Sequence, residues 1–171
     1  TLDSSNQIVS YSGFSEGKVL LQTKKSSKVI SLRGVNTQSG LNVYNLTGST
    51  VLGTHELNNE HEDYPALLVG IQMADKMQLL PGDIISIVSP YGLENVMAGL
   101  SAPRSLQFKI SGIFSVQNNE YDDGLAFTDL ESASYLLGYE ENFQGWDIRL
   151  KNFEDAGDFA ANLSYLSDSG K

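Results

Sequence analysis

The 171-residue sequence contains no cysteine, only two histidines and only four prolines. Without cysteine the chain can form no disulfide, no thiolate nucleophile and no sulfur-ligated metal site. It also lacks an apolar run near the roughly 18 residues that a membrane-spanning helix needs, and a basic-then-apolar signal segment at its start. We therefore expect either a soluble mature protein or a soluble part of a larger chain. Both ends, TLDSSNQ and YLSDSGK, favour the second alternative.

Positive charge is scarce, with 11 lysines and arginines against 21 acidic residues and a net charge of −10. Nucleic-acid partners are not expected, because phosphate contacts need clustered basic side chains. The one basic cluster, KKSSK at residues 24–28, is typical of a hairpin turn. With 40% hydrophobic residues, the chain can build one domain over residues 1–171, or two lobes, a β-rich part at 1–63 and an α+β part at 64–171.

The apolar periodicity predicts an α+β fold, in which short helices pack on a mixed sheet with βαβ-type units and a β-rich N-terminal part. Strands are expected at residues 7–13, 17–23, 28–35, 65–70, 83–88, 106–116, 125–127 and 145–150. Helices are expected at 41–49, 71–80, 129–137 and from Asn152 onward. Gly112 predicts a bulge, and residues 118–124 a turn. Thr128 and Glu131 form a capping box for the third helix.

The residue types that carry catalysis are present without a catalytic pattern. His55 and His61 lie in a polar segment without the spacing of a helical metal site. No Gly-x-Ser-x-Gly elbow and no glycine-rich phosphate loop occurs. We expect no enzyme, no metal and no cofactor. The alternative is a hydrolase that uses the carboxylates of residues 120–123, and it predicts a cleft with a raised carboxyl pKa.

An apolar loop, SPYGLENVMAGLSAPRS at residues 89–105, separates two predicted strands. Long loops in compact domains are usually functional or disordered, and disordered loops are polar. We interpret this one as a long projecting hairpin loop that binds a protein partner, since methionine, aromatic and arginine side chains are typical of interfaces. The alternative is that the loop caps its own core. The candidate partner-binding residues are Pro90, Tyr91, Leu93, Val96, Met97, Leu100, Pro103 and Arg104.

The order of motifs along residues 28–155 resembles the extracytoplasmic domain of the lipoprotein-releasing ABC transporter permeases, the LolC and LolE family. The resemblance rests on ALLVGIQMADKMQLLPGDIISIVSP, on the loop, and on LQFKISGIFSVQNNEYDDGLAFTDLESASYLLG. The matching steps are Gly70 with Ala74, Gly82-Asp83, Gly112-Ile113-Phe114, Tyr121-Asp122, and Ala133 with Leu136-Leu137. MacB-like and FtsX-like permeases share this core and are the alternative within the class.

The resemblance implies a non-catalytic periplasmic domain of an inner-membrane permease that works with a second permease subunit and a cytoplasmic ATPase subunit. It also implies lipoprotein as the substrate and a periplasmic lipoprotein chaperone that docks on the loop at 89–105. The sequence departs from the family at the C-terminal base of this loop, where Arg104 is the only charged residue and the family has more basic and glutamine character.

Overall fold

The computed structural model describes residues 7–58, 63–91, 97–99, 102–139, 143–152, 154, 156–157 and 159–160. The chain opens with a long hairpin of β1 (Ile8–Gln22) and β2 (Ser27–Val35), joined by a turn at the predicted basic cluster. The prediction of two separate strands at 7–13 and 17–23 is wrong, because β1 is one strand that continues through Gly13 and Gly17. Both glycines lie close to other side chains, since an added Cβ at Gly13 would lie 3.2 Å from the Phe143 ring and one at Gly17 would lie 2.5 Å from the end of the Leu137 side chain.

Short elements connect this hairpin to the second half. They are α1 (Ser39–Val43), α2 (Leu46–Ser49) and β3 (Thr50–Gly53). The helix expected at 41–49 is therefore present as two short helices, which break at the left-handed residue Asn45.

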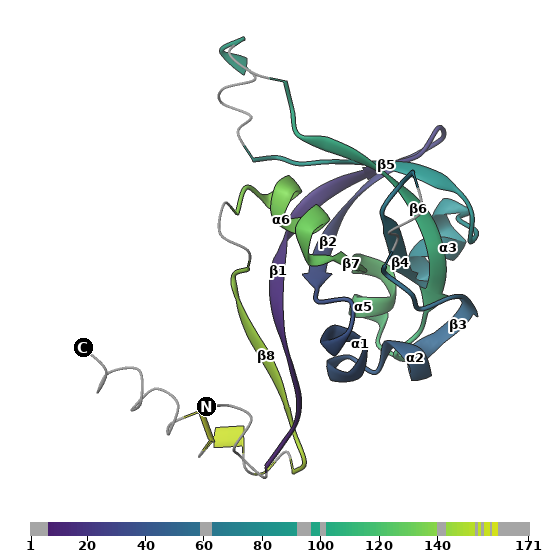
Figure 1. Ribbon diagram of the computed structural model, residues 1–171. Coiled ribbons are helices and arrows are strands. Elements are labelled where there is room, and N and C mark those ends of the chain that lie inside the picture. Colours follow the sequence, from purple (N-terminus) through teal and green to yellow (C-terminus); the bar gives the residue numbers. More distant parts are fainter. Residues whose placement is uncertain are drawn as a thin grey trace.

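The second half follows the predicted order closely (Figure 1). Its elements are β4 (Ala66–Gly70), α3 (Ile71–Met77), β5 (Ile84–Val88), β6 (Ser105–Phe114), α5 (Asn119–Gly124), β7 (Leu125–Asp129), α6 (Leu130–Leu137) and β8 (Gly145–Leu150). The bulge expected at Gly112 is confirmed, because the register between β4 and β6 shifts there. The helix expected from Asn152 falls largely outside the described residues.

Local side-chain hydrogen bonds explain where the second half differs from the prediction. The expected turn at 118–124 is helix α5, because the Asn118 side chain accepts hydrogen bonds from the backbone of Glu120 and Tyr121 and so caps it. Helix α6 is capped by Asp129, which accepts from the Ser132 amide, and not by Thr128. Thr128 is buried and donates to the Ala66 carbonyl instead.

The strands form a mixed sheet that closes on itself, which confirms the α+β prediction. The strand order around the ring is β1, β2, β7, β4, β6 and β5. Strand β5 closes the ring by pairing with β1 at Leu20–Gln22. The β2–β7 and β4–β6 pairs are parallel and the others antiparallel. The first half of β1 leaves the ring and pairs with β8 as a two-stranded ribbon.

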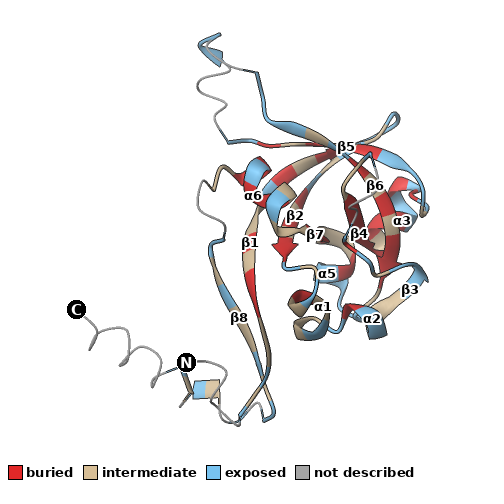
Figure 2. Cartoon of the chain, viewed as in Figure 1, coloured by how far each residue is buried: buried red, intermediate tan, exposed pale blue. Residues whose placement is uncertain are grey.

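The core lies inside the ring and beneath the short helices (Figure 2). Strand β4 is buried at every position, as the run ALLVG predicts. Leu67 and Val69 face a core cluster with α3 and α6, whereas Ala66 and Leu68 face a second cluster around Phe114 and Phe127. The side chains of β5 alternate between buried and more exposed positions, because one face of this strand is open to solvent.

Candidate functional site

The arm is the segment of residues 89–105 that joins β5 to β6. These strands are antiparallel and Val88 pairs with Ser105, so the arm is a hairpin loop. Its described residues lead away from the ring, and the described segment at 97–99 lies apart from the sheet (Figure 1). Met97 is 87% exposed, the highest value among the large hydrophobic side chains that the structure describes. The expectation of a long projecting hairpin loop is confirmed.

The structure separates the candidate partner-binding residues into groups. Pro90, Met97 and Pro103 are exposed. Leu93, Val96 and Leu100 lie outside the described residues. Tyr91 and Arg104 are exposed as well, but their side chains also contact the protein body.

Hydrogen bonds define the root of the arm, one between its two ends and one within its outgoing end. The Ser89 amide donates to the Arg104 carbonyl over 2.9 Å, and the Tyr91 amide donates to the Ser89 hydroxyl over 3.0 Å. Ser89 is buried at 1% exposure. The arm therefore leaves the sheet from a defined point.

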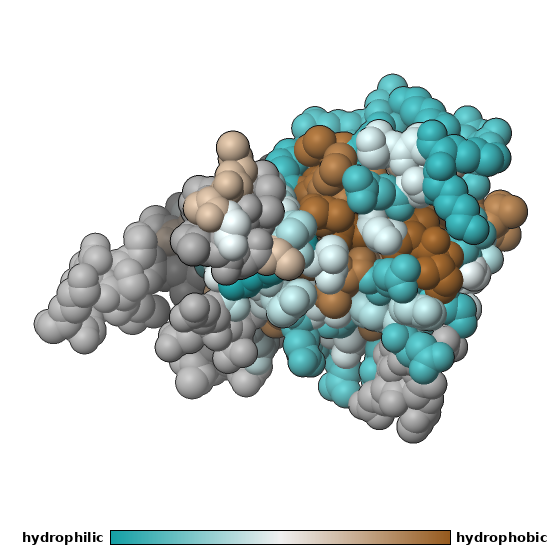
Figure 3. Space-filling model, turned by 90° about the horizontal axis from the view of Figure 1, so that it is seen from above, coloured by the Kyte–Doolittle hydropathy of each residue, from teal (hydrophilic) through white to brown (hydrophobic). Residues whose placement is uncertain are grey.

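A partly exposed aliphatic row lies on the outer face of the sheet at this root, and the sequence analysis missed it. The row consists of Val29, Leu20 and Val88, which pair directly across β2, β1 and β5, so their side chains share one face. Val29 is 64% exposed. Figure 3 views the molecule from the side on which the arm projects and shows hydrophobic atoms bordered by hydrophilic ones. Only the register, and no local motif, brings these residues together.

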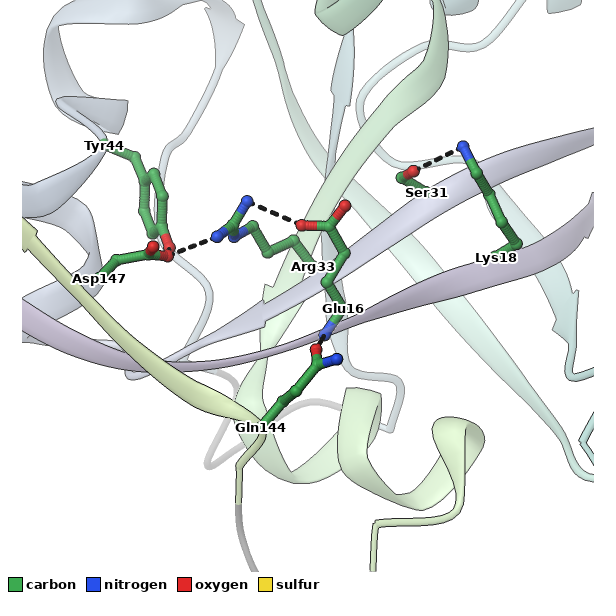
Figure 4. A network of polar contacts seen from close by, with 7 residues as sticks. All are labelled: Glu16, Lys18, Ser31, Arg33, Tyr44, Gln144 and Asp147. Atoms are coloured by element: carbon green, nitrogen blue, oxygen red, sulfur yellow. Dashed lines mark hydrogen bonds and ion pairs between the residues drawn. The ribbon is translucent and has the colours of Figure 1, made fainter. Parts of the chain in front are cut away.

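A polar network fastens the β1–β8 ribbon to the ring (Figure 4). The Arg33 guanidinium forms ion pairs with Glu16 over 2.7 Å and Asp147 over 2.5 Å. It also lies 4.5 Å from the centre of the Phe14 ring. Tyr44 donates a hydrogen bond to Asp147, and burial together with this bond raises the pKa of Tyr44. The network is structural, since each charged group in it has a partner.

Two of the three carboxylates that a hydrolase would use, Asp122 and Asp123, are engaged in structural contacts. Asp122 is buried and accepts hydrogen bonds from the Ser115 hydroxyl and the Val116 amide. Asp123 binds Lys28 over 2.7 Å and Lys76 over 3.0 Å. The hydrogen bonds from these lysines lower the pKa of Asp123, whereas a general acid needs a raised pKa.

The other candidate sites give no support for metal chemistry. His55 is half-buried, and His61 lies outside the described residues. Within the described parts of the chain, no three His, Asp or Glu side chains gather closely enough to hold a metal ion. Likewise, none of the helices described is long and apolar enough to cross a membrane.

Comparison with known sequences identifies similar proteins, although no family model matches. The chain is 24% identical over 148 residues to the lipoprotein-releasing system transmembrane protein LolC of Buchnera aphidicola, and the match covers 86% of this chain and 35% of that protein. It is 25% identical over 97 residues to LolC of Neisseria meningitidis, with 57% of this chain and 23% of that protein covered. The chain thus spans about a third or less of the length of these relatives.

Comparison with solved structures gives the fold. The extracellular domain of the noncanonic ABC-type transporter YknZ from Gram-positive bacteria has a TM-score of 0.60 at 12% identity, covering 92% of this chain and 73% of that one. The periplasmic region of MacB from Actinobacillus actinomycetemcomitans has a TM-score of 0.61 at 11% identity, covering 98% and 70%. The expected resemblance is confirmed: the chain is similar in sequence to LolC proteins and has the fold of the extracytoplasmic domains of MacB and YknZ.

Proposed function

We propose that this chain is the periplasmic domain of an inner-membrane ABC transporter permease, and that it carries out no catalysis itself. The sequence similarity to LolC and the shared fold with MacB and YknZ support this assignment. In such an assembly a cytoplasmic ATPase subunit supplies the energy, and a second permease subunit completes the membrane part. The domain's task is then to bind and guide proteins outside the membrane.

The finer proposal is that the domain helps release lipoproteins and passes them to a soluble periplasmic carrier that docks on the arm. The observation that carries it is the position of Met97, a large apolar side chain held 87% exposed at a distance from the core. The exposed Met97 side chain on the arm and the row of Val29, Leu20 and Val88 at its root both offer apolar surface to a protein partner. Leu93, Val96 and Leu100 remain predicted members of this surface.

A second candidate function is efflux or signalling of the MacB or FtsX type. The fold favours it as much as lipoprotein release, since the MacB periplasmic region has this fold over 98% of the chain. In that case the arm would contact a transported substrate or a partner of an efflux assembly, and not a soluble lipoprotein carrier.

Photo-crosslinking in living cells tests these proposals. A crosslinking amino acid replaces Met97 in the whole membrane protein, and adducts are identified by mass spectrometry. The control position is Tyr121, which is 51% exposed on α5 and distant from the arm. Tyr135 is unsuitable as a control, because Arg104 contacts it at the arm's root.

The outcomes separate the candidates. An adduct with a soluble lipoprotein carrier from position 97, absent at position 121, supports docking on the arm. Adducts with a transported substrate or an efflux partner would favour the second candidate. Crosslinks from position 97 only to other parts of its own chain would show that the arm caps the domain, and the docking proposal would be abandoned.

A further inference from the structure

The two ends of the arm are held at, and just beyond, the C-terminal end of α6. On the outgoing side, the Tyr91 side chain lies beside Tyr139, whose pKa is raised by burial and by Tyr91. An ideal Cβ at Gly17 would lie 3.4 Å from the Tyr91 hydroxyl, so the end of the Tyr91 side chain lies against β1. Tyr139 itself packs on the core. Tyr91, although 44% exposed, therefore joins the arm to the ring.

On the returning side, Arg104 closes over the C-terminal end of α6. Its guanidinium donates a hydrogen bond to the Tyr135 carbonyl over 2.9 Å. It also lies 5.8 Å from the centre of the Tyr135 ring, within cation–π range. The same group lies beside Gly138, the left-handed residue that ends the helix. A cation at this end also interacts favourably with the carbonyl groups that the helix leaves without intrahelical partners.

Helix α6 is in turn fixed firmly on the ring. Gly34 of β2 leaves no room for a side chain, since an added Cβ would lie 2.3 Å from the Ala133 Cβ. The hydroxyl groups of Ser15 and Ser134 are 3.0 Å apart and hydrogen-bonded within the interior. Whatever is attached to the last turn of α6 is therefore attached to the rigid part of the protein.

We infer that Tyr91 and Arg104 are positioning residues, which hold the arm in one direction relative to the ring by fastening its outgoing end to β1 and Tyr139 and its returning end to α6. This inference rests on the proposed docking function and assigns these residues a role other than contact with the partner. If the arm sampled many directions, the partner would bind more weakly, because only the fraction of molecules whose arm points in the binding direction can dock. If release of the root lowered that fraction to about one tenth, the apparent affinity would fall about ten-fold.

Distance measurement by electron paramagnetic resonance tests the inference without any partner. Since the sequence has no cysteine, nitroxide labels can be placed specifically with Met97→Cys on the arm and Asp75→Cys on the exposed side of α3. The distance distribution is compared between this doubly labelled chain and the same chain carrying Arg104→Ala, Tyr91→Phe or both.

The matched control is Arg149→Ala. Arg149 also donates to a main-chain carbonyl, that of Asn42, over 3.0 Å, but on the β1–β8 ribbon. Its removal should leave the distribution unchanged. Arg104→Lys keeps a donor for the Tyr135 carbonyl and loses the planar stacking, so it should give an intermediate width.

We expect a narrow distribution in the parent and one about two-fold wider in the double variant, since freed loops move by several ångströms. A double variant as narrow as the parent, or a parent already as wide as the double variant, would overturn the inference. An Arg104→Lys width equal to that of Arg104→Ala would overturn the role given to the carbonyl hydrogen bond. The docking function is judged separately by the adducts from position 97, so a failure of either proposal can be recognised on its own.

Discussion

Replacement of Met97 by alanine distinguishes between two roles of the arm, docking a partner and capping the core. Met97 is 87% exposed, so only about one eighth of it is removed from water. Complete burial of a methionine side chain contributes about 1.5–3 kcal/mol, and the buried eighth therefore contributes about 0.2–0.4 kcal/mol. The free energy of unfolding should change by less than about 0.5 kcal/mol.

Met73 provides the matched control, because it is the same residue in the opposite environment. It is fully buried on α3 within the larger core cluster. Met73→Ala removes those contacts and leaves a cavity, which should lower the free energy of unfolding by about 2–5 kcal/mol.

Urea denaturation followed by circular dichroism measures both variants, with binding of the carrier recorded for Met97→Ala in parallel. The expected pattern is unchanged stability with weakened binding. A loss of more than about 1 kcal/mol in Met97→Ala would refute the reasoning, because such a value requires a buried side chain.

Three further substitutions test how the site is supported. Gly70→Ala should lower the free energy of unfolding by about 2–3 kcal/mol, since the new Cβ would lie 2.3 Å from the backbone carbonyl oxygen of Asp122. A smaller loss, measured by urea denaturation, would mean that α5 can shift to make room. Arg33→Ala should lower it by about 2 kcal/mol through the loss of two partly exposed ion pairs and an aromatic contact. A double-mutant cycle with Asp147→Asn measures the coupling, and zero coupling would contradict the network. Asp123→Asn should flatten the acid side of the pH–stability profile. Because the folded-state pKa of Asp123 is lowered, its stabilising effect is present above the unfolded value near about 4 and is lost as the pH falls through the folded value. An unchanged thermal-melting profile between pH 6 and 2 would speak against this ion pair.

Most regular elements could be predicted because their sequences carry a strong local pattern. The apolar run of β4 and the helix of α3 that follows it are examples, and Gly138 at the end of α6 is another. Errors in the predicted elements arose where a single side-chain hydrogen bond decides whether a segment forms a turn or a helix. Asn118 turns the expected loop into α5, and nothing in the acidic run itself indicates this.

The candidate site was predictable in part. An apolar segment between two strands indicated the arm, and its length and composition were sufficient for that inference. The roles within the arm were not predictable. Tyr91 and Arg104 look like typical interface residues in sequence, yet their neighbours Tyr139 and Tyr135 lie just after and within α6, which the chain reaches only later.

The sequence by itself determined the α+β class, the exclusion of cysteine chemistry and the position of the arm, because composition and local periodicity are properties of neighbouring residues. Only the tertiary structure decided how the sheet closes and which side chains share a surface. Leu20 meets Val88 across 68 positions of sequence because β1 pairs with β5, and Arg33 meets Asp147 because β8 returns beside β1. Such contacts depend on strand register and crossing connections, which no local segment encodes.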